Sequence, residues 1–403
     1  MVLTMIVAFC LRFQISTVAR EQLIQMILLL AGPQFENFKM GNYLLSKLFD
    51  SPDYAIVYNY FCNKFNEVLY STSKKKFKKC TLTCLKCNLE QHFTLKSKNY
   101  FISLDLEYQL KMLIDKKEEY EELFKPRCDT TNTDNLIRDV YDGDLYKQIN
   151  IPPCNDNDTV YVTYNYSTDG APLTKSGKRG FWPLQIIINN LSPKLRFKNV
   201  LLAGVLSCTQ EPKSSLISSY FDIFLKQVNK LKNGGVRVIN KSGQSVKFVF
   251  YPLFCVLDTI ARALLQNRKQ FNAYFGCSWC YHLGKYFKKL GIRYPLKATT
   301  ELRSNKSHKE EVRLIKSKVS GKVMSSVPGT SSKNKKRNNK NLEPDHRGVK
   351  GDISLSQIPS IDMVWSFVWE YMHIVLSGID TQINRNWTSS KSKSKFKLTK
   401  KQI

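Results

Sequence analysis

Two aspartates stand where carboxylates could bind a divalent cation. Asp169 and Asp258 each follow an apolar run that predicts a strand, so each is expected at a strand's carboxyl end. Oxygen ligands suit hard ions such as Mg²⁺, and two such ions about 3.5–4 Å apart can clamp a phosphodiester under attack. The same residues admit a plainer interpretation, in which Asp169-Gly170 is a turn and Asp258 caps the N-terminus of a helix. The two aspartates alone leave both interpretations open.

The charge of the chain indicates a polyanionic partner. Among its 403 residues, 62 Lys and Arg stand against 33 Asp and Glu, which gives a formal net charge of +29. Nucleic acid suits this charge better than a membrane does, because no stretch reaches the roughly 18 consecutive apolar residues of a membrane span. The apolar content of 42% excludes a chain that is disordered throughout. We therefore expect a folded protein with a nucleic-acid partner and no membrane contact, and this partner favours the cation site.

Eleven cysteines offer a second kind of chemistry. Their odd number and their spread over a long basic chain differ from the disulfide framework of a secreted domain, so we expect reduced thiols. Two pairs have C-x-x-C spacing, Cys84 with Cys87 and Cys277 with Cys280. Zinc takes four ligands and each pair supplies two, so the pairs are candidates for two separate metal sites.

The segments around the two aspartates predict an α/β domain. Three apolar runs indicate strands, a periodic segment that ends at Gly234 indicates a helix, and a fourth run and a second periodic segment follow. In chain order these segments are Val160–Tyr166, Trp182–Leu191, Phe197–Leu206, Ser215–Leu231, Val246–Leu257 and Thr259–Phe271. The order is β-β-β-α-β-α, and the aspartates follow the first and fourth strands.

Composition divides the chain into successive segments. In order, we expect an N-terminal helical segment (1–50), a Cys- and Lys-rich small module plus a helix (51–126), a linker (127–157), the α/β core (158–295), a disordered basic linker (296–351), a helix (352–388) and a basic tail (389–403). The linker at 296–351 holds too little apolar surface to order itself. The last helix is expected over Ile361–Ile379, where apolar residues return.

Nine short strings occur in a fixed order along most of the chain. They are Tyr100–Ile102, Asp139–Gly143, Tyr166–Gly170, Phe181–Leu184, Ile188–Leu191, Val200–Gly204, Leu257–Arg262, Tyr274–Cys280 and Trp369–His373. Together and in this order, they resemble the transposase-domain proteins of CACTA (En/Spm-like) DNA transposons in animal genomes.

The resemblance implies a DDE-type recombinase with an RNase H-like core, whose order of elements agrees with β-β-β-α-β-α. It makes Asp169 and Asp258 the first two catalytic carboxylates, with Mg²⁺ or Mn²⁺ as the cofactor and DNA phosphodiesters as the substrate. In the intact family the implied activity is strand cleavage and transfer. A nuclear location follows from the DNA partner, and a homo-oligomer is compatible with it.

Zinc enters as a further cofactor through the same resemblance. The family's C-x-x-C after the second aspartate matches Cys277 and Cys280, and its acid-x-x-His motif matches Glu370 and His373. Cys277, Cys280 and His373, with His282 as a spare, are the expected ligands of one zinc ion. In the alternative interpretation, the cysteines are small core residues and His373 is hydrogen-bonded locally.

The N-terminal module departs from the family pattern. The family pairs two C-x-x-C motifs there, but Phe65 stands where the mate of Cys62 belongs. Cys62, Cys84 and Cys87 remain as an incomplete zinc set, for which Cys80 is the substitute fourth ligand.

A second departure concerns catalysis. The family's third carboxylate lies well downstream of the motif at Glu370 and His373, beyond the last residue of this sequence, and Glu370 is not assigned to that role. The resemblance therefore implies a C-terminally truncated fragment that is inactive. The alternative is a non-catalytic, domesticated nuclear DNA-binding protein.

Two further patterns concern phosphate. A basic run that could act in nuclear import, contact DNA phosphates or serve as a solvated linker contains Lys333, Lys335, Lys336 and Arg337. A phosphate-binding loop is absent from the sequence, because Gly177-Lys178 is followed by Arg179 rather than a hydroxyl residue. No nucleotide cofactor is expected.

Overall fold

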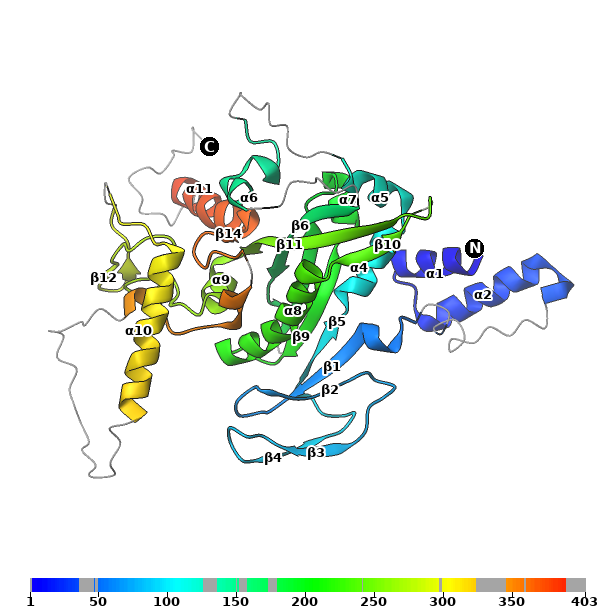
Figure 1. The fold of residues 1–403 in the computed structure, drawn as a ribbon, viewed down its shortest axis with the longest axis horizontal. Coiled ribbons are helices and arrows are strands. Elements are labelled where there is room, and N and C mark those ends of the chain that lie inside the picture. The colour runs from blue at the N-terminus through cyan, green and yellow to red at the C-terminus, as the bar shows by residue number, and fades with distance from the viewer. Residues whose placement is uncertain are drawn as a thin grey trace. The chain divides into compact units, whose positions relative to one another are not determined.

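The computed structural model divides the chain into two compact units, Met1–Ala55 and Ile56–Ile403 (Figure 1). The structure describes residues 2–35, 47, 50–125, 136–149, 151, 158–172, 180–240, 242–296, 299–323, 346–358 and 360–388. Within these ranges, no helix combines the length and the apolar character needed to cross a membrane. The basic run Lys333–Arg337 and the tail at 389–403 lie outside the described residues.

The first unit is a pair of helices, as its apolar spacing predicts. The helices are α1 (Val2–Arg12) and α2 (Thr17–Ala31). Ile6, Cys10 and Ile24 are buried in one cluster between them. α2 ends at Gly32, whose positive φ of 103° is a conformation that glycine adopts without strain.

The second unit contains both strands and helices. Its strands are β1 (Ile56–Phe61), β2 (Val68–Thr72), β3 (Cys80–Thr83), β4 (Glu90–Phe93), β5 (Tyr100–Leu104), β6 (Thr159–Thr168), β7 (Ala171–Pro172), β8 (Gly180–Ile188), β9 (Leu201–Cys208), β10 (Val236–Ile239), β11 (Ser245–Leu257), β12 (Lys285–Phe287), β13 (Gly291–Arg293) and β14 (Phe367–Trp369). Its α-helices are α4 (Leu106–Ile114), α5 (Lys117–Leu123), α6 (Asp144–Gln148), α7 (Pro193–Lys198), α8 (Ser214–Asn233), α9 (Thr259–Leu265), α10 (Asn305–Val323) and α11 (Thr381–Thr388). The fold class is mixed α/β, as the sequence predicts.

Within the described residues, a mixed sheet of ten strands forms the centre of this unit. Its order is β10-β11-β6-β8-β9-β5-β1-β2, with β7 beside β8 and β14 beside β11. β6 and β14 both run parallel to β11, whereas β8 runs antiparallel to β6 and β9 runs antiparallel to β8. The carboxyl ends of β6, β11 and β14 therefore meet at one edge of the sheet.

The core follows the predicted order of elements with three local differences. β6, β8, α8 and β11 fall on the predicted segments. β9 begins at Leu201 rather than Phe197, because Pro193 opens the short helix α7, where a proline is favoured. α9 ends at Leu265, before the predicted Phe271. β10 is an additional strand of four residues, too short to give a clear period.

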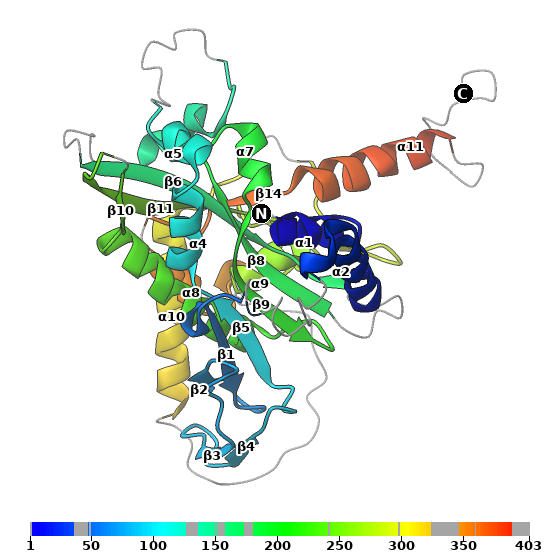
Figure 2. The ribbon, with the colours of Figure 1, turned by 90° about the vertical axis from the view of Figure 1, so that its right-hand side faces the viewer.

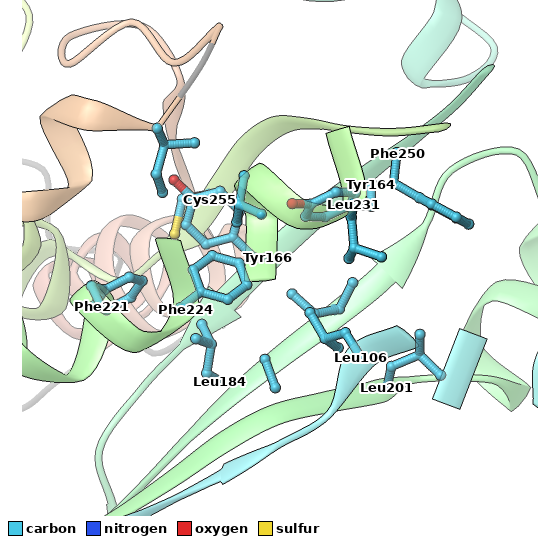
Figure 3. Close-up of a cluster of buried hydrophobic side chains, with 14 of the residues drawn as sticks. Leu106, Tyr164, Tyr166, Leu184, Leu201, Phe221, Phe224, Leu231, Phe250 and Cys255 are labelled. Carbon is cyan, nitrogen blue, oxygen red and sulfur yellow. The ribbon is translucent and has the colours of Figure 1, made fainter. Parts of the chain in front are cut away.

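α8 and α4 pack against the sheet and against each other (Figure 1 and Figure 2). α8 buries a stripe at helical spacing, made of Leu216, Ile217, Tyr220, Phe221, Phe224, Val228 and Leu231. Figure 3 shows Phe224 and Leu231 of this helix gathered with Tyr166 of β6 and Leu106 of α4. Each fully buried apolar side chain contributes about 1.5–3 kcal/mol, so this layer fixes the strands that carry the two aspartates.

The small module predicted at 51–126 is not a separate domain. β1 pairs with β5 and β5 pairs with β9, so these strands extend the core sheet, while β3 and β4 form a two-stranded sheet of their own. The helix expected at the end of the module is two helices, α4 and α5, with Asp115 and Lys116 between them. The pairing of β5 with β9 joins segments that are distant in sequence, which a local pattern does not reveal.

The prediction of a disordered linker over 296–351 is wrong for its described part. Residues 305–323 form α10, and Arg303 and Glu311 are buried. Glu311 forms ion pairs with Arg268 at 3.3 Å and with Arg303 at 3.4 Å, and it accepts a hydrogen bond from the Tyr281 hydroxyl at 2.7 Å. Composition counts such charges as solvated, but here they neutralise one another inside the fold.

The helix predicted over Ile361–Ile379 also begins later than expected. Its first part contains the short strand β14, which pairs with the end of β11. A π-helix at Met372–Asp380 follows and continues into α11. A strand of three residues inside an apolar run has too few residues to show a strand's alternation, so the sequence pattern missed it.

Candidate functional site

Three acidic residues lie at one edge of the sheet, each directly after a parallel strand. Asp169 follows β6, Asp258 follows β11 and Glu370 follows β14. His373 lies one helical turn beyond Glu370 and joins the same group. We call these four residues the carboxylate edge.

The strand registers place the acids level with one another. Ser167 of β6 lies opposite Val256 of β11, each two residues before its aspartate. Leu257 of β11 lies opposite Trp369 of β14, each one residue before its acid. Neighbouring strands are about 4.8 Å apart, so the three side chains start from adjacent positions.

Asp169 lies in a break within an extended segment rather than in a turn. The strands on either side of it, β6 and β7, both pair with β8. A Cβ atom on Gly170 would lie 2.8 Å from the ring of Trp182, so the glycine is required here. Asp169 Oδ1 accepts a hydrogen bond from the backbone N–H of Gly170 at 2.6 Å, and Oδ2 has no hydrogen-bond partner among the described residues. An exposed carboxylate oxygen is therefore available for a ligand.

Asp258 is the N-cap of α9, which confirms the plainer interpretation of this residue. Its Oδ1 accepts a hydrogen bond from the backbone N–H of Ala261 at 2.6 Å. In the part of the chain that the structure describes, its Oδ2 has no hydrogen-bond partner. Capping and cation binding use different oxygens of one carboxylate, so the cap does not exclude a metal role.

The carboxylate edge carries a concentration of negative charge. Burial and the neighbouring Asp258 carboxylate raise the pKa of Asp169, and Glu370 acts in the same direction. The N–H of Gly170 and the nearby His373 oppose this rise. A pKa raised by neighbouring carboxylates indicates a site that would gain stability from a cation, and perturbed groups of this kind gather at functional sites.

Glu370 and His373 form a bonded pair. Glu370 Oε2 accepts a hydrogen bond from the backbone N–H of His373 at 2.8 Å and lies 2.5 Å from its ring Nδ1, while Oε1 accepts from the N–H of Met372 at 3.0 Å. Burial acts to raise the pKa of Glu370, but the hydrogen bonds from His373 and Met372 lower it overall. Both oxygens of Glu370 are engaged, so its role at this edge is to hold the imidazole in place.

Arg262 is a buried residue beside this edge that sequence reasoning missed. Its guanidinium lies 3.8 Å from the ring of Trp279 and 5.3 Å from that of Trp369, and two of its nitrogens, Nε and Nη1, have no hydrogen-bond partner in the described chain. Burial lowers the pKa of Arg262 to about 10, against the opposing effects of Cys277 and Asp258. Arg262 lies in α9 and contacts Trp369 of β14, so it links the two elements close to Asp258 and Glu370. The one signal in the sequence is its place in the string that begins with Leu257.

The zinc set predicted from Cys277, Cys280 and His373 is not formed. The two cysteine Sγ atoms lie 3.3 Å apart, but among the described residues no third metal-binding side chain joins them. β14 holds His373 at the carboxylate edge instead, and His282 packs its ring against Tyr294.

A buried arginine contacts the turn between Cys277 and Cys280. Arg303 Nε donates hydrogen bonds to the carbonyl oxygens of both cysteines, each at 3.1 Å. Arg303 is in turn paired with Glu311 and stacked on the ring of Tyr281, 4.1 Å from its centroid. These contacts engage the backbone carbonyl groups of the turn.

The three cysteines of the incomplete zinc set do come together. The Sγ atoms of Cys62, Cys84 and Cys87 all lie within 4.8 Å of one another, and we call these residues the thiol cluster. Cys80, expected as the substitute fourth ligand, lies within β3 opposite Phe93 and is not a member. Cysteine thiolates are usual ligands of zinc, so the thiol cluster has the donor atoms for a zinc site.

The chain matches no family model and no curated protein.

Proposed function

We propose that the chain is a fragment of a transposase-derived protein whose intact form acts on DNA phosphodiesters, with Mg²⁺ or Mn²⁺ held by Asp169 and Asp258. The observation that carries the proposal is the meeting of these two carboxylates at level ends of parallel strands. The order β6-β8-β9-α8-β11-α9 supports it, because an RNase H-like core of the CACTA type has this order. The net charge of +29 supports a DNA partner and a nuclear location.

The two aspartates would hold the ions through their unbonded Oδ2 atoms. When bound, such ions activate the attacking oxygen and stabilise the leaving oxygen of a phosphodiester. Glu370 fixes His373 beside Asp169, where the imidazole can donate or accept a proton. Arg262 holds α9 and β14 in register, so that Asp258 and Glu370 keep their positions.

Nicking of supercoiled plasmid in Mn²⁺ tests the proposal. Because no third carboxylate of the family is assigned here, we expect only weak nicking by the wild type, and at least about 10²-fold less from Asp258→Asn, because one charged ligand is lost. Asparagine caps a helix as well as aspartate does, so this variant should keep its fold. Nicking that is equal in both proteins, or that persists in EDTA, would contradict the proposal.

The second candidate is a nuclear DNA-binding protein without catalysis, which the same charge favours. Such a protein would bind duplex DNA with an affinity that falls steeply with salt, with a slope of about −0.9 per phosphate contact on logarithmic axes. Its affinity would be indifferent to Asp258→Asn and to Mn²⁺. Salt-dependent binding with no Mn²⁺-dependent nicking would favour this candidate over the first.

A further inference from the structure

Two turns in the β1–β4 region share one backbone conformation. The first runs from Cys62 to Glu67 and the second from Cys84 to Leu89. In each, the cysteine N–H donates to the carbonyl of the last residue, at 2.8 and 3.0 Å. In each, the carbonyl of the cysteine accepts from an asparagine N–H four residues later, at 2.8 Å. The chain therefore contains two copies of one tight turn, placed face to face.

The asparagines of the two turns confirm the correspondence. Asn66 and Asn88 both have positive φ, at 60° and 53°, a conformation that asparagine tolerates better than most residues. Aligning them places Phe65 at the position of Cys87. The second turn thus supplies two sulfurs and the first supplies one.

The three sulfurs are spaced as ligands of one ion. Cys62 and Cys84 have no exposed surface, and the Sγ atoms of Cys62 and Cys87 lie 3.6 Å apart. Zinc–sulfur bonds of about 2.3 Å in tetrahedral geometry put two sulfurs about 3.8 Å apart. The free side chains already adopt nearly this arrangement.

Glu67 is the nearest candidate for the fourth ligand. Its Oε2 lies 3.9 Å from the Sγ of Cys84, and its Oε1 lies 3.6 Å from Nζ of Lys86. Phe65, which replaces the second cysteine of the first turn, has a side chain that is 41% exposed. Zinc accepts carboxylate oxygens at about 2.0–2.2 Å, so a small rotation of the Glu67 side chain would complete a tetrahedron.

We propose that Cys62, Cys84, Cys87 and Glu67 bind one zinc ion, in a mixed site of three thiolates and one carboxylate. The site joins the hairpin of β3 and β4 to the end of β1, and thus to the main sheet. A two-stranded hairpin is marginal alone, so this link has a structural purpose. It is independent of the chemistry proposed for the carboxylate edge.

Cobalt titration of the full chain, after removal of metal by a chelator, tests this site. The wild type should bind one Co²⁺ with a thiolate charge-transfer band and the intense visible bands of tetrahedral cobalt. Cys84→Ser should lose these bands, and Cys280→Ser should keep them. Equal spectra for the two cysteine variants, or no thiolate band in the wild type, would overturn the site.

Variants that keep all three cysteines test the fourth ligand and guard against simple misfolding. Glu67→Gln should weaken Co²⁺ binding at least about tenfold and alter the visible bands, whereas Glu90→Gln, at an exposed acid of the same hairpin, should not. Phe65→Cys should tighten binding and make a further Glu67→Gln change silent. Identical affinities for the Glu67 and Glu90 variants would overturn the role of Glu67.

Discussion

The carboxylate edge and the thiol cluster are both built at the ends of strands, but they differ in every property that matters to a metal. Asp169 is exposed and its neighbour Asp258 is partly so, with hard oxygen atoms that repel each other. Cys62 and Cys84 are fully buried, with soft sulfur atoms that are already grouped. Open oxygen sites exchange ions and admit substrate, whereas closed sulfur sites hold zinc as part of the fold. We therefore expect the carboxylate edge to act in a reaction and the thiol cluster to stabilise the fold.

The pair Cys277 and Cys280 sharpens this comparison. It has the same spacing as Cys84 and Cys87, yet Arg303 bonds both of its carbonyl groups and no third metal ligand of the described chain joins it. A C-x-x-C motif thus becomes a candidate metal site here only where a second turn faces it.

The first expected effect follows from disrupting the thiol cluster. Cys84→Ser should raise the rate of amide hydrogen exchange in β3 and β4 by about 100-fold or more, because the hairpin loses its metal link. Hydrogen exchange read by mass spectrometry measures this, with Cys280→Ser as the control. Unchanged protection of the hairpin in Cys84→Ser would contradict the structural role.

A second effect concerns the buried ion pairs beside the turn of Cys277 and Cys280. Glu311→Ala should lower the free energy of unfolding by about 3–5 kcal/mol, since it leaves two buried guanidinium groups without their carboxylate. Urea unfolding with and without EDTA measures it, and the loss should be the same in both. The matched control is Glu121→Ala, whose ion pair with Lys117 is exposed and should be worth less than about 1 kcal/mol.

A smaller effect separates the two roles of Asp258, which are to cap α9 and to bind a cation. Asp258→Ala should lower the free energy of unfolding by about 1 kcal/mol, because the cap of α9 is lost. Asp258→Asn should lower it by no more than about 0.3 kcal/mol, because asparagine caps a helix as well as aspartate does. Urea unfolding of both variants without divalent ions makes the comparison. If Asp258→Asn and Asp258→Ala lower the free energy of unfolding equally, the helix cap does not explain how Asp258 stabilises the fold.

The smallest effect is a dependence on pH at the carboxylate edge. Because burial and Asp258 raise the pKa of Asp169, the folded state favours its protonated form and loses stability as the pH rises through that pKa. Asp169→Asn should therefore melt slightly higher than the wild type at pH 8 without divalent ions, and the difference should vanish below pH 3.8, the ordinary pKa of an aspartate. A gain that is the same at both pH values would point to a cause other than ionisation.

Much of the core was predictable because its signals are local. β6 and β11 are continuous apolar runs, α8 repeats apolar residues at helical spacing, and both aspartates follow directly after strands. These features depend on neighbours in the chain, which a single sequence displays.

The remainder depends on contacts between distant segments. β5 joins the core sheet by pairing with β9, and β14 reaches the carboxylate edge by pairing with β11. Likewise, the buried charges of Arg303 and Glu311 have the composition of a solvated linker. The partnership of His373 with Glu370 rather than with Cys277 follows from β14, so missing that strand grouped His373 with the wrong side chains.

Binding of Mn²⁺, measured by electron paramagnetic resonance, tests most directly whether the carboxylate edge binds Mn²⁺ while the thiol cluster binds zinc. The zinc-loaded wild type and Cys280→Ser should bind Mn²⁺, and Asp169→Asn and Asp258→Asn should each weaken that binding at least about tenfold. Zinc content should be equal in all four proteins. The same Mn²⁺ affinity in the wild type and both aspartate variants would contradict the account.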